Sequence, residues 1–161
     1  MAVDFEVKGL IEAQRKCEQV VRDLVGTPIL DAMRDSTLIV QAGAKKNLVA
    51  YESPEVGGVD SGRTRASYTP EIRLSGDVVA GVVGSNLKTA LWQETGTRPH
   101  WPPIDALVIW ARRHGTTAYL VARGIARHGT RARRPLGRAF EDARDKIVAR
   151  FERAMKEIID Q

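Results

Sequence analysis

Three histidines have the residue type best suited to chemistry in this sequence: His100, His114 and His128, which stand fourteen positions apart. Imidazole binds metals such as zinc, usually from ligand pairs only a few residues apart. None of these histidines has such a partner, and the single cysteine, Cys17, provides no cysteine pair to complete a site. The spacing therefore predicts hydrogen bonds at helix ends and in a loop, and it predicts neither a metal nor another cofactor.

Nucleophilic and phosphate-binding motifs are also missing from the sequence. No serine stands in a Gly-x-Ser-x-Gly elbow, the turn that exposes the nucleophile of many hydrolases. Gly81 and Gly84 fall within a stretch of β-branched residues, and no Gly-Lys-Ser or Gly-Lys-Thr follows them as in a phosphate-binding loop. The sequence therefore predicts a protein without catalytic residues, and a small hydrolase would need a residue set that these patterns do not supply.

Arginine is concentrated in one part of the chain. Of the net charge of +5, the segment from Arg98 to Arg138 carries +8, because it holds nine arginines and one acid, Asp105; the rest of the chain is −3. Such polarity predicts a basic face that meets an acidic partner, either nucleic acid or another protein surface. The candidate basic cluster, DNA-facing or salt-bridging, comprises Arg127, Arg131, Arg133 and Arg134.

Both functions of this basic cluster remain open. Guanidinium groups can neutralise phosphates, and Trp101, Trp110 and Tyr119 are near enough in sequence to stack on bases. No helix-turn-helix, zinc-finger or RNA-recognition signature accompanies them, which argues against sequence-specific binding. A non-specific contact with DNA and a salt-bridged subunit interface explain the charge equally well.

The composition is typical of one soluble globular domain. The 161 residues are 43% hydrophobic and 28% charged, so we expect a single domain over residues 1–161. No apolar run is long enough to cross a bilayer, and residues 1–6 carry acids where a secretory signal would be apolar. The lone Cys17 suits a reducing cytoplasm, and its place in an apolar stripe predicts a small buried side chain.

Two helices are expected to open the chain, over residues 8–25 and from Pro28 to about Ala50, because apolar residues recur there every three or four positions. The first helix should bury a stripe that includes Ala13, Cys17 and Val20. The stripe of the second helix should consist of Leu30, Met33, Thr37, Val40, Ala44 and Leu48.

A mobile loop and a hairpin are expected next. Residues 52–62 are rich in breakers and have no period, which predicts the loop. Residues 64–74 and 78–84 contain β-branched residues and are separated by Ser75-Gly76-Asp77, which predicts two antiparallel strands joined by a tight turn. One face of this sheet should pack on helices.

Short helices and one long helix complete the expected fold. A helix over residues 87–94 should turn Leu91 and Trp92 inward, and the three prolines that follow forbid regular structure as far as residue 103. Two helices end at glycines 115 and 129, and a long amphipathic helix begins at Pro135. Its apolar stripe is Leu136, Phe140, Ala143, Ile147, Phe151, Ala154 and Ile158. The order of elements predicts an α+β fold with two N-terminal helices, a small antiparallel sheet, short helices and a long C-terminal helix.

Four short motifs occur in an order that is typical of one protein family. They are Ser-Gly-Arg-Thr-Arg-Ala-Ser at residues 61–67, Val-Val-Gly-Ser-Asn at 82–86, Trp-Gln-Glu-Thr-Gly-Thr at 92–97, and Arg-Arg-Pro-Leu-Gly-Arg-Ala at 133–139. With the proline-rich loop between the last two, they resemble the siphophage tail-completion and head–tail joining (neck) proteins, often labelled minor tail proteins. Thr95 stands where that family usually has Phe, and residues 119–125 are similar to a subset of it only.

The resemblance implies a small subunit that assembles into a six-fold ring between the head connector and the tail tube of a phage. Its partners would be copies of itself, the head connector or stopper protein, and the tail tube or tail terminator protein, with non-specific contact to packaged DNA and none to a membrane. It would assemble in the host cytoplasm and reside in the virion. Tail terminator and tail-to-head joiner both remain open, and a basic DNA-binding accessory protein is the competing class.

Within such a ring, the segment around the proline-rich loop is expected to contact a neighbouring subunit. The candidate interface residues are Trp92, Glu94, Arg98, His100 and Trp101. A second explanation of the loop stays open, in which it is a rigid connector that packs Trp101 into the subunit's own core. Residues 52–62 would order only on docking, which would discourage premature rings.

Overall fold

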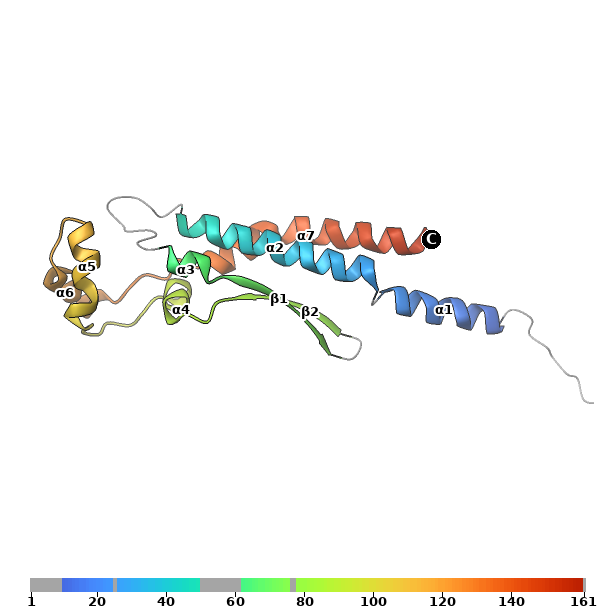
Figure 1. Ribbon diagram of the computed structural model, residues 1–161, viewed down its shortest axis with the longest axis horizontal. Coiled ribbons are helices and arrows are strands. Elements are labelled where there is room, and N and C mark those ends of the chain that lie inside the picture. The colour runs from blue at the N-terminus through green and yellow to red at the C-terminus, as the bar shows by residue number, and fades with distance from the viewer. Residues whose placement is uncertain (1–9, 25, 50–61, 76–77, 161) are drawn as a thin grey trace, which may run out of the picture.

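The computed structural model describes residues 10–24, 26–49, 62–75 and 78–160. The fold is α+β, mostly helical, with one two-stranded antiparallel sheet and a long C-terminal helix (Figure 1). Its elements in chain order are α1 (Leu10–Leu24), α2 (Thr27–Val49), α3 (Arg63–Ala66), β1 (Thr69–Ser75), β2 (Val78–Gly84), α4 (Lys88–Thr95), α5 (Ile104–Arg113), α6 (Ala118–His128) and α7 (Pro135–Ile159).

An antiparallel pair of long helices, α2 and α7, forms the body of the molecule (Figure 1). Their contact is built from small side chains, with Val40, Ala44, Ala139 and Ala143 buried between them. The helices approach so closely that a Cβ atom added at Gly43 would lie 3.0 Å from the Cβ of Ala139. Pro135 suits the first turn of α7, where no backbone N–H is needed for the helix.

The hairpin lies along α2 on one side of this pair (Figure 1). The register runs from Thr69 opposite Gly84 to Ser75 opposite Val78, so both predicted strands exist. The first strand begins at Thr69 rather than at residue 64, because the short helix α3 occupies Arg63–Ala66. Gly62 leads into that helix with a φ of 70°, and the Ser67 hydroxyl donates 2.7 Å to the Thr64 carbonyl, which closes its last turn.

Helices α5 and α6 pack on each other and form a lobe at the end of the molecule away from α1 (Figure 1). Two extended segments connect the lobe to the body, and they are joined by an isolated antiparallel bridge between Thr97 and Thr130. Gly115 follows α5 with a φ of 64° and Gly129 ends α6 with a φ of 69°, so both predicted helix-ending glycines are confirmed.

Helix α1 corrects one prediction about the core. It extends past the end of the α2–α7 pair (Figure 1), and Ala13, Cys17 and Val20 are exposed. The prediction that this stripe, Cys17 included, is buried was therefore wrong for the single chain. The apolar pattern is real, but the described part of the chain leaves these three side chains exposed.

Three further side chains are exposed where the sequence predicted burial: Leu91, Trp92 and Phe140. The predicted stripe of α2 is confirmed at Thr37, Val40, Ala44 and Leu48, all of which are buried, and Leu30 and Met33 are half-buried. Alanine fills much of the core. Eight of the twelve buried hydrophobic residues in the described part of the chain are alanines: Ala32, Ala44, Ala90, Ala111, Ala122, Ala139, Ala143 and Ala154.

Several expectations fall outside the residues that the structure describes. They concern residues 1–6, the loop at 52–61 and the turn at Gly76-Asp77. Among the helices within the described ranges, none combines the length and the apolar character needed to cross a bilayer.

Candidate functional site

The C-terminal end of α4 contacts the start of α7 through a carboxylate. Oε2 of Glu94 accepts a hydrogen bond of 2.9 Å from the backbone N–H of Leu136, and Oε1 accepts one of 2.8 Å from Gly137. The first turn of α7 contains no acidic residue, and Arg134 at its N-cap makes no side-chain cap. Glu94 thus supplies both the missing acceptors and the negative charge that the positive end of a helix favours.

The backbone of α4 continues the same contact. The carbonyl oxygen of Gln93 accepts hydrogen bonds from the N–H groups of Arg133, at 2.8 Å, and Arg134, at 3.2 Å. The side-chain amide of Asn47 on α2 donates a hydrogen bond of 3.0 Å to the carbonyl oxygen of Pro135. These contacts fix the chain before α7 firmly enough to hold Arg134 at a φ of 52°, which a non-glycine residue rarely adopts.

A second set of polar contacts joins the segments before and after the hairpin, which include α3 and α4. The hydroxyls of Ser67 and Ser85 lie 2.6 Å apart, and those of Thr64 and Thr89 lie 2.9 Å apart. Between these pairs Tyr68 is buried in a cluster with Leu48 and Ala90. The four motifs quoted for the family resemblance, far apart in sequence, therefore supply the contacts of one region, which we call the motif junction: residues 62–68, 84–97 and 133–137.

The environment of Tyr68 is electrostatically unusual. Burial of the phenol, and secondarily the negative charge of Glu94, raise the pKa of Tyr68 to about 12. Both causes act in the same direction, because each disfavours the phenolate. Tyr68 therefore remains a neutral core residue at physiological pH.

The predicted interface residues separate into two groups. Trp92 and Trp101 are 49% and 53% exposed, and Arg98 and His100 are exposed as well. Trp101 lies edge-on to Tyr119 with ring centroids 5.9 Å apart, so the alternative in which Trp101 packs into the chain's own core is wrong. Glu94 differs from the other four, because both of its carboxylate oxygens are used inside the chain.

The predicted basic cluster is also divided. Arg127, in the last turn of α6, and Arg131, which follows that helix, are both exposed. Arg133 is half-buried, and burial lowers the pKa of its guanidinium. The guanidinium of Arg134 forms an ion pair of 2.7 Å with Glu141. Two of the four arginines are thus engaged in the fold, and phosphate contact would fall mainly to the exposed pair.

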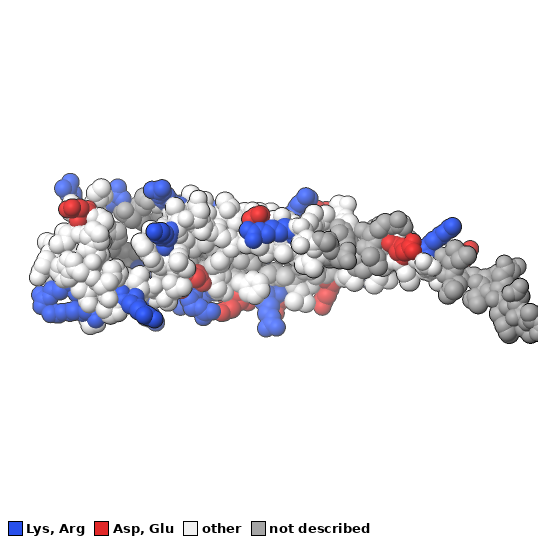
Figure 2. Space-filling model, turned by 90° about the horizontal axis from the view of Figure 1, so that it is seen from below, with Lys and Arg blue, Asp and Glu red and all other residues white. Residues whose placement is uncertain are grey.

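Sequence reasoning missed an apolar surface on the α5–α6 lobe. Each side chain of this surface is more than a third exposed, and Ile109 is 65% exposed. Figure 2 shows basic side chains around uncharged surface at this end of the molecule. The lobe surface, as we name it, consists of Trp101, Ile104, Val108, Ile109, Tyr119 and Leu120. The available signal was that α5 carries apolar residues in an unbroken run from Ala106 to Ala111, more than one buried face can use.

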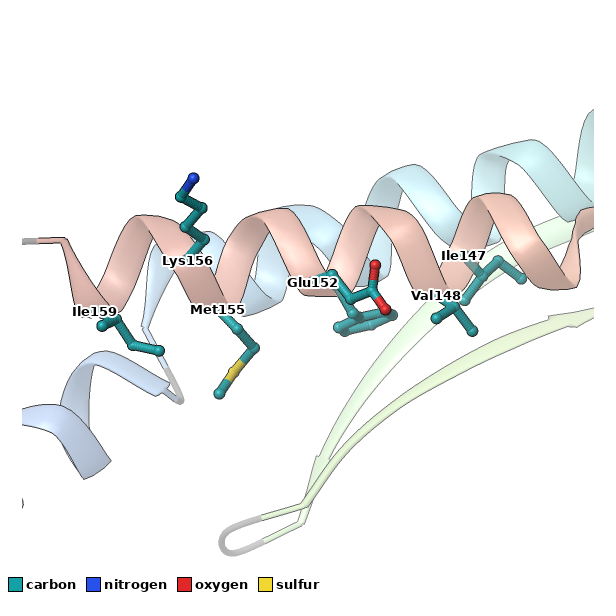
Figure 3. Close-up of a pocket in the computed structure, with 7 residues that line it drawn as sticks. Ile147, Val148, Glu152, Met155, Lys156 and Ile159 are labelled. Carbon is teal, nitrogen blue, oxygen red and sulfur yellow. The ribbon is translucent and has the colours of Figure 1, made fainter.

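Two apolar grooves lie on the body. One, of about 540 Å³, is bounded by α2, β2 and α7, with Glu94 as its one charged lining residue. The other, of about 530 Å³, runs along the C-terminal half of α7 (Figure 3). We call it the α7 groove; its main lining residues are Val148, Phe151, Glu152, Met155, Lys156 and Ile159. Neither lining contains a nucleophile with a neighbouring base.

The predicted histidine roles have partial structural counterparts. His100 Nδ1 lies 2.8 Å from the Arg98 carbonyl oxygen, and the His114 ring stacks on Trp110 at the end of α5. Across the described part of the chain, no three His, Cys, Asp or Glu side chains gather in a way that could hold a metal ion.

No protein-family model, curated protein or solved structure matches this chain.

Proposed function

We propose that this chain is a structural protein of a tailed-phage or prophage particle, a ring subunit at the head–tail junction that completes the tail and joins it to the head connector. The proposal starts from the four-motif resemblance. The residues of those motifs build the motif junction, so they maintain the subunit's shape.

One observation carries the assembly part of the proposal: the large apolar side chains lie outside and the core is mostly alanine. A monomeric protein rarely exposes large contiguous apolar patches, because each exposed large side chain forgoes about 1.5–3 kcal/mol of burial. The lobe surface and the α7 groove lie at opposite ends of the elongated chain (Figure 1). Two unlike surfaces on one subunit are what a closed ring of head-to-tail contacts requires.

Charge separation supports the same function. The segment from Arg98 to Arg138, which includes the lobe, holds nine of the eighteen arginines and only one acid, whereas the rest of the chain is net acidic. A basic, apolar lobe fits an acidic surface on a partner, either a second copy or the connector, stopper, tail tube or terminator protein of the particle. The proposed location is therefore the virion, after assembly in the host cytoplasm.

Deletion of the gene from the phage or prophage that carries it, followed by negative-stain electron microscopy of the lysate, tests this function. DNA-filled heads beside separate tails would establish a joining role, and abnormally long tails would establish a terminator role. Wild-type protein supplied in trans should restore normal particles. Normal, infectious particles without the gene would overturn the proposal.

The alternative function, a basic non-specific DNA-binding accessory protein, is favoured by the exposure of Arg127 and Arg131. It predicts retention of the purified protein on DNA that falls steeply as salt rises. It further predicts that the Arg127→Ala/Arg131→Ala variant loses this retention. Because a ring subunit can also touch packaged DNA, this alternative would be favoured by such retention together with normal particles after deletion of the gene.

A further inference from the structure

The two edges of the hairpin sheet differ in character. Strand β1 carries Pro70 and the ion pair of Glu71 with Arg73, whereas β2 has the sequence Val-Val-Ala-Gly-Val-Val-Gly, with neither a proline nor a charge. Prolines and charged side chains are the usual means by which proteins prevent pairing at an exposed strand edge. The edge of β2 lacks both, so it is open to pairing with another strand.

The backbone groups at this open edge follow from the register of the hairpin. Pro70 has no N–H to donate, which makes its pair with Val83 a non-hydrogen-bonded one. Because such pairs alternate with hydrogen-bonded pairs, the N–H and C=O groups of Val79, Gly81 and Val83 point away from β1. In the described part of the chain, no backbone hydrogen bond outside the hairpin involves these groups.

The sheet covers one of the two long helices and leaves much of the other uncovered. Both strands contact α2. Neighbouring strands are about 4.8 Å apart and packed helices about 8–10 Å apart, so two strands span only about half the width of the α2–α7 pair. On α7, Phe140, Val148 and Met155 are 56%, 50% and 39% exposed. The layer formed by the hairpin therefore has room for a further strand beside β2, along α7.

An apolar groove occupies this position. The groove of about 540 Å³ has Gly81 and Val83 of β2 on one side and Phe140 of α7 on the other. It shares Ile147 and Phe151 with the α7 groove, so the two continue along one helix face. Figure 3 shows the hairpin beside this stretch of α7. An open strand edge and an apolar helix face thus border one site, which we call the strand groove: the outer edge of β2 with Phe140, Ile147 and Phe151.

An extended polypeptide would satisfy both sides of the strand groove. Its backbone would pair with β2, and its alternate side chains would cover α7. The hairpin of a second copy does not qualify, because the face that carries Gly81 is already packed against Met33 and Thr37 of its own α2. The occupant must therefore bring an apolar strand face that is not already covered.

We propose that residues 3–8 of a second copy pair with β2 and fill the strand groove. Their sequence, Val-Asp-Phe-Glu-Val-Lys, alternates strictly between apolar and polar side chains, which is the pattern of a strand with one buried face. This segment precedes α1 and lies outside the described residues. The side chains that would face α7 are Val3, Phe5 and Val7.

Gly81 sets the register of the added strand. It lines the groove without a side chain, and an aromatic residue opposite a strand glycine restores the packing that the glycine lacks. Phe5 is the one aromatic residue of the segment, so we place it opposite Gly81. Valines two positions away on each strand then lie opposite each other, whichever way the added strand runs.

The reach of the chain favours a second copy as the donor. Helix α1 extends past the body with its N-terminal end farthest away (Figure 1), and its 15 residues span about 22 Å. Gly81 lies against Met33, which is about 9 Å further back along α2. Phe5 would have to bridge about 30 Å to its own Gly81, but the chain from Phe5 to Leu10 spans at most about 18 Å.

Each copy has both the segment and the strand groove, so the contact is head-to-tail, and every donor can also accept. The pairing would cover a strand edge that is otherwise a hazard for aggregation. This inference deepens the proposed function, on which it rests for the requirement that copies assemble.

Cross-linking between two variants of the full chain tests this contact. Both carry Cys17→Ser; one adds Glu6→Cys, and the other adds Ala80→Cys or Val82→Cys. Mild oxidation of the mixture should join one chain of each kind, at twice the 17.8 kDa chain mass. Ala80→Cys should react if the added strand is antiparallel to β2, and Val82→Cys if it is parallel. Arg73→Cys, opposite Ala80 on β1 and one strand further away, is the matched control. It should give about fivefold less product or lower, because a disulfide needs Cβ atoms about 4 Å apart.

Two matched pairs of substitutions test the apolar face. In the donor chain, Phe5→Ser should slow cross-linking about tenfold or more, whereas Asp4→Ser, on the other face of the segment, should change the rate less than about twofold. In the acceptor chain, Phe140→Glu should act like Phe5→Ser. Leu38→Glu should not, because Leu38 is 50% exposed on α2 and does not line the groove. Circular dichroism verifies that all four variants are folded.

Equal yields from Ala80→Cys, Val82→Cys and Arg73→Cys would overturn the inference, as would equal rates for Phe5→Ser and Asp4→Ser. Uncross-linked monomers would also overturn it, and the strand groove would then be left to the chain's own segment or to an extended segment of another protein. Particle morphology after gene deletion decides the proposed function independently, so the two failures are distinguishable.

Discussion

Thr97 and Thr130 exchange two backbone hydrogen bonds, of 3.0 and 3.1 Å, and their hydroxyl oxygens lie 2.9 Å apart. This pair closes the base of the α5–α6 lobe, where the two connecting segments run antiparallel. Each threonine is next to a glycine with positive φ, Gly96 at 70° and Gly129 at 69°. A Cβ atom at Gly129 would collide with the Thr97 carbonyl oxygen, and one at Gly96 would collide with that of Thr130. The lobe is thus attached through a backbone contact that only glycine permits.

Gly129→Ala should therefore destabilise the protein by about 2 kcal/mol or more, from backbone strain together with loss of the bridge. Chemical denaturation followed by circular dichroism measures the change. Gly124→Ala is the matched control, because Gly124 lies within α6 and an added Cβ meets nothing within 4 Å. That variant should gain up to about 1 kcal/mol from helix propensity. Equal stability of the two variants would contradict the close contact at the base of the lobe.

Glu94→Ala should cost about 2–3 kcal/mol, because two backbone N–H groups at the start of α7 lose a charged acceptor. Glu141→Ala is the matched control: it removes only an exposed ion pair with Arg134 and should cost less than about 1 kcal/mol. Urea denaturation gives both values. Hydrogen exchange at the amides of Leu136 and Gly137 should accelerate in Glu94→Ala alone. Unchanged protection of these amides would show that Glu94 does not cap α7.

The buried phenol of Tyr68 predicts a loss of stability in alkali. The folded chain keeps the proton up to a pKa of about 12, whereas the unfolded chain releases it near 10. Below pH 10 both states are protonated, so Tyr68 adds no pH dependence there. Between pH 10 and 12 the unfolded state gains ionisation that the folded state lacks, and stability should fall by about 1.4 kcal/mol per pH unit.

Comparison with Tyr68→Phe isolates this effect from other groups that titrate in alkali. Between pH 9 and pH 11, the free energy of unfolding of the wild type should fall by about 1 kcal/mol more than that of Tyr68→Phe. Tyr119→Phe, at an exposed position, is the control and should retain the wild-type pH dependence. Parallel pH profiles for the wild type and Tyr68→Phe would refute the prediction.

The helices and the hairpin were predictable because periodicity and turn chemistry act locally. Pro135 and the glycines at 115 and 129 mark helix ends through backbone constraints, and the structure confirms these ends. The start of β1 was missed, because residues 63–66 have a composition compatible with either state and the Ser67 hydroxyl closes a helical turn there.

Burial was less predictable than secondary structure. An apolar stripe indicates that a helix has an apolar face, but it does not indicate which molecule covers that face. Val20 on α1, Trp92 on α4 and Phe140 on α7 were expected to be buried, and all three are exposed in the single chain. The role of Glu94 was hidden for a related reason, since its partners, Leu136 and Gly137, lie more than forty residues away and are backbone groups without a sequence signature.

The lobe surface should be essential to assembly but dispensable for folding. Ile109 is 65% exposed, so Ile109→Glu should leave the circular dichroism spectrum and the denaturation midpoint close to those of the wild type. In a docked lobe, however, the new carboxylate would be buried without a partner, at a cost of several kcal/mol. Expressed in trans in the gene-deletion lysogen or infection, Ile109→Glu should fail to restore infectious particles. Leu74→Glu, at the similarly exposed end of β1, is the matched control and should restore them. Full complementation by Ile109→Glu would show that the lobe surface is not needed for assembly. The exposed arginines around it would then be the remaining candidates for a partner contact.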